Sequence, residues 1–354
     1  MNKIKNKSPV VVNVNVSHER AERYSFYTPA FIVEDDAHER SLEVFSLDDL
    51  VKNGYDVDSP AYIYCALAFA QEQRVDSIYI ISKKTTESYL DAFIASPYNK
   101  FYFISTDSVN EDDIIEISDH LTRYSIRKLL FISKYTDISA KLIGRRNIVW
   151  LWKTEFWFWD SSAIVVWDSN LDVELAIRQY PESAWISRCG SLFPSQVQWS
   201  CKELVAVSTQ DYFTPQQGVD YDMTDHTEPP FTTPSNWYEN IMDYDVTWGD
   251  GTTCNGEWVD NVVFDDWMVW AIQRNIWKLF KISPKVNTTS DGLDKIESKL
   301  KEVLDFGIEQ DGILTYKITE SKFDRLTRKC SFKFNYTRLH AIIGVVSIDG
   351  TVNY

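Results

Sequence analysis

The sequence predicts a mixed α/β protein, and three observations lead to this fold class. Between residues 85 and 185, short apolar runs rich in β-branched and aromatic residues alternate with segments of helical periodicity. Strands interleaved with helices are typical of helices packed on a largely parallel sheet. The last third of the chain contains two consecutive helical segments. The 354 residues, 44% of them hydrophobic, suffice for two or three domains with substantial cores.

The composition argues against several classes of function. A formal net charge of −16 is unsuited to coating nucleic acid, because binding phosphates needs a basic face. The five cysteines are scattered and form no C-x-x-C pair, which favours a reducing compartment and no zinc site. No apolar run is long enough to span a bilayer, and the first residues lack the apolar core of a signal peptide. We therefore expect a protein without cofactor or membrane insertion, made and kept soluble in a cytoplasm.

The chain begins with a predicted strand that follows a Lys-rich start. Val10, Val12, Val14 and Val16 lie on one face of a period-two pattern. Such a strand is either an ordinary edge strand or one that pairs with another molecule.

The next segments predict three strands and two helices before residue 84. The strands are expected at 31–33, 43–45 and 77–82, and the helices at 47–53 and 61–73. Further along, helices are predicted at 89–96, 110–125 and 171–180, and strands at 100–106, 127–134, 147–153 and 162–169. None of these strands leads into a dinucleotide, P-loop or nucleophile-elbow motif, so the layout alone indicates no activity.

A run of tryptophans supports one alternative function. Trp150, Trp152, Trp157 and Trp159 would form a surface for a glycan if they were exposed in a row. Large aromatics are more often buried, so a strand buried on both faces is the favoured interpretation of the residues around 153–160.

Turn-forming residues fill 186–248, and two acidic clusters lie in or near this stretch. Asp220, Asp222 and Asp225 with His226 form the first, and Asp243, Asp245 and Asp250 form the second. An α/β hydrolase-like enzyme with an acidic active-site loop is the second alternative. Neither cluster has the spacing of an EF-hand, and no catalytic or metal-binding residue is assigned.

The last third predicts a helical pair. In the first helix, Asp265 and Asp266 mark the start, and apolar residues nearly encircle the helix, which predicts that most of it is buried. The second has an apolar stripe along 293–308, with Ser290 or Asp291 as its expected cap. Gly312 is expected in the left-handed position after it. Glu297 and Lys301 form a favourable i, i+4 pair on its polar face.

These segments resemble the contractile phage tail sheath family. The resemblance lies in the order of features: GEWVD at 256–260, DDW at 265–267 followed by Gln273, TSDG at 289–292, an amphipathic helix ending in Gly-Ile, and the closing LHAIIGVVSIDGTV. The order of elements before residue 84 is also similar to the beginning of sheath proteins.

The resemblance implies a conserved sheath domain built from N-terminal and C-terminal segments, with an α/β sandwich between them. The expected division is an N-terminal arm at 1–17, the first part of the sheath core at 18–84, an α/β domain at 85–195, a C-terminal sheath domain at 196–338, and a C-terminal strand and arm at 339–354.

The resemblance also implies a structural role with no enzyme activity. Subunits would polymerise as hexameric rings stacked helically around a tail tube in a virion tail, and contraction would drive the tube through the host envelope. Tube, baseplate and tail terminator proteins would be the partners. The arms would link subunits through strands that contain the four valines and Ile348, Thr351 and Val352. The second helix would face the tube through Lys295, Lys299, Lys301 and Glu302.

Overall fold

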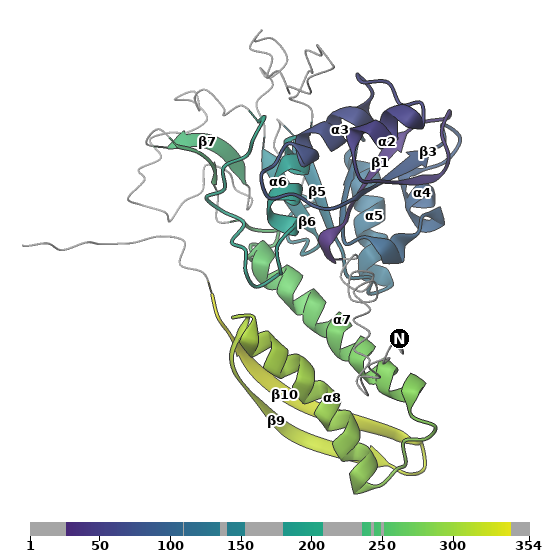
Figure 1. Ribbon diagram of the computed structural model, residues 1–354, viewed down its shortest axis with the longest axis vertical. Helices are drawn as coiled ribbons and strands as arrows, with labels where there is room; N and C mark the ends of the chain where they lie inside the picture. The colour runs from purple at the N-terminus through teal and green to yellow at the C-terminus, as the bar shows by residue number, and fades with distance from the viewer. Residues whose placement is uncertain are drawn as a thin grey trace, which may run out of the picture.

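The computed structural model describes residues 26–108, 110–134, 140–152, 180–207, 236–241, 244–248 and 251–340. An α/β body forms one end of the elongated molecule, and two helices with a β-hairpin form the other (Figure 1). The long helix α7 (Val259–Ile282) runs from the body toward the far end.

The body is built on a six-stranded sheet with the order β2-β3-β1-β4-β5-β6. Every neighbouring pair is parallel except β2 and β3, which are antiparallel, so the prediction of a largely parallel sheet is confirmed. Side chains of β1 alternate between the two faces, with Phe31 in one core and Ile32 in the other. The strands are β1 (Pro29–Glu34), β2 (Ser41–Val44), β3 (Ile78–Lys83), β4 (Phe103–Thr106), β5 (Leu129–Lys134) and β6 (Ile148–Trp152).

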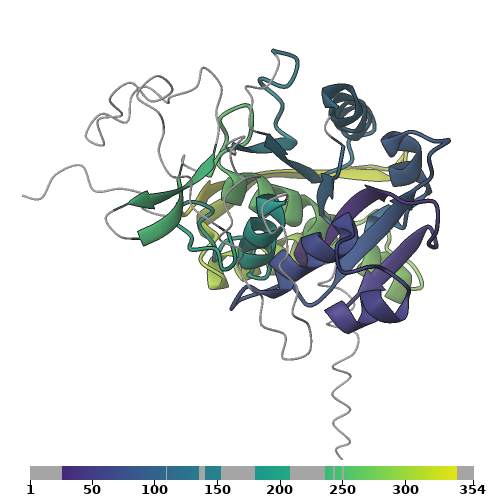
Figure 2. The ribbon, with the colours of Figure 1, turned by 90° about the horizontal axis from the view of Figure 1, so that it is seen from above.

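Helices cover both faces of this sheet (Figure 2). On one face lie α2 (Leu47–Lys52), α3 (Pro60–Phe69) and α6 (Pro181–Gly190), and on the other lie α4 (Tyr89–Ala95) and α5 (Glu111–Arg123). Local signals explain where several of them begin. The Ser59 hydroxyl accepts from the Tyr62 amide ahead of Pro60, and Ser88 and Asn110 cap α4 and α5 in the same way.

Two of the expected domain boundaries need correction. β1 pairs with both β3 and β4, so the boundary expected between 84 and 85 runs through a single sheet. The segment 18–84 thus contributes strands to the α/β body. The boundary expected at 195/196 also cuts a core, because the Trp199 ring lies 5.5 Å from Trp185 and 5.3 Å from Phe131. The helix α6 lies partly in the stretch expected to consist of turns.

The far end consists of α8 (Ser290–Glu309), β9 (Ile313–Asp324) and β10 (Lys329–Arg338). Thr289 caps α8, rather than Ser290 or Asp291, since its hydroxyl accepts from the Gly292 amide. Asp311 adopts the left-handed conformation with φ 55°, in place of the predicted Gly312. A smaller hairpin of β7 (Trp237–Ile241) and β8 (Tyr244–Trp248) adjoins β6. In the described part of the chain, no helix combines the length and hydropathy needed to cross a bilayer.

Candidate functional site

The helix α7 connects the α/β body to the far end, and its two halves have different surroundings. Its first ten residues include seven buried ones, which pack on the body and on α8: Val259, Val262, Val263, Phe264, Asp266, Trp267 and Met268. The last turns are exposed, with Trp277 at 72%, Phe280 at 45% and Ile282 at 70%. The prediction that most of this helix is buried is therefore wrong for its second half, where apolar residues face outward.

Asp266 fastens α7 to the body. Its carboxylate is 1% exposed and accepts from Arg127 Nη1 at 2.7 Å and Arg146 Nη1 at 3.2 Å. The Tyr102 hydroxyl donates to the same carboxylate at 2.8 Å. Burial and then the charge of Asp266 raise the pKa of Tyr102 well above its usual value. The sequence placed Asp266 at the helix start, but the helix begins at Val259, and the carboxylate serves a buried ion-pair network.

The neighbouring Asp265 contacts the β9–β10 hairpin instead of the body. Its carboxylate accepts from the Tyr336 hydroxyl at 2.6 Å and forms an ion pair with Arg338. Burial, followed by the hydrogen bond to Asp265, raises the pKa of Tyr336 to about 12. Two consecutive carboxylates thus hold α7 against the body on one side and against the hairpin on the other.

Gly312 joins α8 to β9 beneath α7, and it is needed there for space rather than for its backbone conformation. A Cβ at this position would lie 2.9 Å from Cβ of Ser195 and closer still to the Phe264 ring. The close approach lets the hairpin start directly under the helical pair, with Ile313 buried.

The hairpin of β9 and β10 is a two-stranded antiparallel sheet with ten residue pairs, and its register shifts between Lys333 and Phe334 and between Thr337 and Arg338. Tyr316, Ile318, Phe332, Phe334 and Tyr336 pack on α7 and α8 from one of its faces. Among the described residues no third strand joins it, so both outer edges present backbone groups. Apolar and polar residues alternate with period two in much of 314–336, and this pattern could have predicted the hairpin from the sequence.

The polar face of α8 carries the lysines expected to face a tube, and each has an ion-pair partner within the helix. Lys295 pairs with Asp291 at 2.9 Å, Lys301 with Glu297 at 2.8 Å, and Lys299 with Glu302. The predicted Glu297–Lys301 pair is confirmed. Hydrogen bonding to Glu297 raises the pKa of Lys301, and bonding to Lys299 lowers that of Glu302. This face is charged but locally balanced.

Two grooves lie where the far end meets the body. The larger, about 900 Å³, runs between the body and the helical pair and is lined by aromatic and cationic side chains that include Phe193, Trp270, Arg274 and Lys278. The smaller, about 600 Å³, lies near the start of α7 beside Asp260, Arg338 and His340. Burial raises the pKa of Asp260, and the His340 ring contacts Trp258.

In the part of the chain that the structure describes, the side chains that could act in catalysis or metal binding do not gather in one site. Within these residues no three His, Cys, Asp or Glu side chains are placed to hold a metal ion. Burial raises the pKa of Cys189 and Cys254 to about 12, so both stay protonated thiols. The cluster of Asp220, Asp222, Asp225 and His226 lies outside the described residues, as do Asp243 and Asp250.

Only part of the tryptophan row lies among the described residues, and the predicted arm positions lie outside them. Trp150 is fully buried in the sheet, which contradicts the exposed row that a glycan-binding surface requires. Trp157 and Trp159 lie outside the described residues. So do the arm positions Val10, Val12, Val14, Val16, Ile348, Thr351 and Val352.

Comparison with known proteins identifies the fold. No family model and no curated protein matches the sequence. Solved structures match almost the whole chain. A chain of the six-fold symmetrised baseplate of the anti-feeding prophage (AFP) aligns with TM-score 0.61 and 11% identity, over 93% of this chain and 94% of that one.

Two sheaths in the contracted state align as well. The AFP helical sheath gives TM-score 0.60 and 12% identity over 91% of this chain and 92% of that one. The sheath complex of PVC, an extracellular contractile injection system, gives 0.60 and 13% over 92% of each chain. The mixed α/β fold is thus that of sheath chains in contractile injection systems, as the resemblance implied.

Proposed function

We propose that this chain is a structural subunit of a contractile sheath, which polymerises around an inner tube and contracts to drive it through the host envelope. The observation that supports this most directly is the likeness in fold to two contracted sheaths, which extends over 91–92% of this chain. A sheath subunit works through its contacts with other chains, so this function needs neither a catalytic centre nor a cofactor.

Strand exchange between copies is the proposed linkage. The β9–β10 hairpin offers two strand edges, and a third strand that adds to such an edge gains main-chain hydrogen bonds. The N-terminal strand with Val10, Val12, Val14 and Val16 and the C-terminal segment with Ile348, Thr351 and Val352 are the donors. The period-two pattern of the four valines is that of a strand.

The proposed partners follow from the same architecture. The α8 face with Lys295, Lys299, Lys301 and Glu302 docks on the tube, and baseplate and tail terminator proteins hold the two ends of the sheath. The six-fold symmetry of the AFP baseplate, which contains one of the structural neighbours, supports hexameric rings. The particle is the tail of a phage, where contraction serves DNA ejection, or a phage-derived injection particle, and its subunits are assembled in the host cytoplasm.

Electron microscopy of the purified full chain tests this function. In negative stain we expect tubes of stacked rings. Introducing charge on the valine face, as in V12D with V14D, should leave a folded chain that forms no tubes. The matched control N13D with N15D places the same charge on the opposite face of the same strand and should still assemble. A chain that stays monomeric at all concentrations and salt conditions, with or without a tube protein, would contradict the proposal.

A further inference from the structure

The exposed end of α7 is a surface that neither the arms nor the tube-facing helix accounts for. Trp277, Phe280 and Ile282 present apolar area there, alternating with Lys278 and Lys281, and we call these five residues the α7-end surface. Residues 267–290 contain four Lys or Arg and no acidic residue, in a chain with net charge −16. Exposed apolar side chains among cations are typical of a surface that binds an acidic partner.

The α/β body carries a surface of complementary chemistry around α2. Phe45 is 50% and Val51 49% exposed, and the exposed acids Asp48, Asp56 and Asp58 lie in the same short segment of the chain. We call these five residues the α2 surface. The segment 34–58 that contains it holds nine acidic residues against two Lys or Arg. Both surfaces therefore combine apolar area with charge, and the charges have opposite sign.

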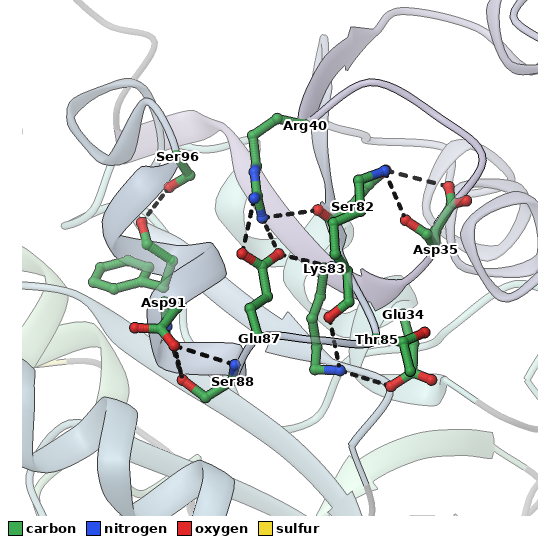
Figure 3. A network of polar contacts seen from close by, with 12 residues as sticks. Glu34, Asp35, Arg40, Ser82, Lys83, Thr85, Glu87, Ser88, Asp91 and Ser96 are labelled. Atoms are coloured by element: carbon green, nitrogen blue, oxygen red, sulfur yellow. Dashed lines mark hydrogen bonds and ion pairs between the residues drawn. The ribbon is translucent and has the colours of Figure 1, made fainter.

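Two cations of the same part of the body, Arg40 and Lys83, are already engaged within the fold (Figure 3), while Lys52 in the last turn of α2 is exposed. The Arg40 guanidinium pairs with Glu87 and also donates to the Ser82 carbonyl at 3.1 Å. Lys83 pairs with Glu34 at 2.7 Å. No ion pair among the described residues involves Asp48, Asp56 or Asp58, so these carboxylates are open to an external partner.

The other strongly acidic element, α5, is a poorer match. Its exposed Asp112 lies 3.5 Å from Lys141, and Asp119 lies 2.5 Å from Arg145, so cations of the same chain already offset part of its charge. The large apolar side chain that is well exposed beside it is Tyr124, the residue that follows its last turn.

The two surfaces lie at opposite ends of the molecule. In Figure 1, α2 is at the top of the α/β body, and α7 ends beside α8 at the bottom. A 24-residue helix is roughly 36 Å long, which carries its end far from the body on which its first turns pack. The surfaces cannot meet within one copy. A head-to-tail contact between copies produces a ring where the rotation closes and an open stack or helix where it does not.

We propose that the α7-end surface docks on the α2 surface of a second copy of this chain. The contact adds a side-chain interface along the stack, separate from the strand exchange of the arms. The inference rests on the proposed sheath function in that both require self-association, but the two can be tested separately.

A charge-swap experiment tests the contact by sedimentation velocity of the full chain, which measures pairwise association and does not depend on tube formation. K278E with K281E on one surface, or D48K with D56K on the other, should each weaken self-association about tenfold. Combining all four changes in one chain should restore it. The control K100E with R123E carries the same charge change as K278E with K281E, lies on the opposite face of the sheet from α2, and should associate like the wild type.

A photo-crosslinking residue at position 280 adds a positional readout in a mixture of isotopically light and heavy chains. We expect crosslinks that join the peptide with position 280 of a light chain to a peptide from residues 41–59 of a heavy chain, or the reverse. Single-surface variants that associate normally, or a four-fold variant as weak as its parents, would overturn the contact. If tubes never form yet the charge swap restores pairwise association, the contact stands and the sheath function fails. If tubes form and sedimentation is unaffected by every variant, the sheath function stands and the contact fails.

Discussion

Replacing Asp266 by Asn should loosen α7 from the α/β body. The carboxylate is 1% exposed and is shared by Arg127, Arg146 and the Tyr102 hydroxyl. An amide oxygen can still accept from Tyr102, but the negative charge between the two guanidinium groups is lost. Removing one member of a buried ion pair costs about 3–5 kcal/mol. Because Arg127 is 46% and Arg146 36% exposed, both rehydrate in part, and we expect D266N to cost about 2–3 kcal/mol.

Urea denaturation followed by tryptophan fluorescence and far-UV circular dichroism measures this cost. The adjacent variant D265N is the matched control, since it removes the same charge one residue away and contacts the hairpin instead of the body. We expect D265N to lose about 1 kcal/mol, because the Asp265 side chain is 20% exposed and that of Asp266 only 1%. A D266N protein that unfolds at the same urea concentration as the wild type would falsify the role of Asp266 as the fastening of α7.

Three further changes have definite expected outcomes. G312A should cost about 1–3 kcal/mol through the clash with Phe264, and F264L should recover part of that loss in a double-mutant cycle; equal and additive losses would contradict the clash. Burial lowers the pKa of Lys128 in the folded chain to about 7. Above that pH the unfolded chain binds more protons than the folded chain, so the stability of the wild type rises from pH 7 toward 10. The stability advantage of K128M over the wild type should therefore shrink by about 2–3 kcal/mol between pH 6 and 9, and a constant difference would show that Lys128 titrates normally. On α8, reversing Lys295, Lys299 and Lys301 to Glu should weaken co-assembly with the tube protein, while E297K with K301E keeps an i, i+4 pair and should separate docking from a helix effect of about 0.3–0.5 kcal/mol.

Much of the α/β body could be predicted from the sequence because its signals are local. Residues 129–132 are a continuous apolar run, as is typical of strands buried on both faces. Ser59, Ser88 and Asn110 stand directly before the helices they cap. The order of strands in the sheet is not local. β1 pairs with β3 on one side and with β4 on the other, and no pattern within residues 29–34 states this, so the boundary expected at residue 84 was misplaced.

The contacts of α7 could not be predicted from the sequence, for a different reason. Its apolar residues surround the helix along its whole length, which indicates burial, but the sequence does not say whether the covering surface belongs to the same chain. The first turns are covered by the body and α8, and Trp277 and Ile282 are not covered. Asp265 and Asp266 likewise look like favourable charges for a helix start, while their partners Arg338 and Arg146 are distant in sequence.

The double fastening of α7 bears on how a subunit of this fold can move. Asp266 and the buried residues around it fix the helix to the body, and Asp265 fixes the hairpin to the helix through Tyr336 and Arg338. A displacement of the hairpin relative to the body must therefore break one of these polar contacts and expose the apolar cluster that α7 shares with both. The contact proposed between copies joins exposed charges, which cost less to separate. Rearrangement of a sheath built from this chain should accordingly occur between subunits, with each subunit moving as a unit.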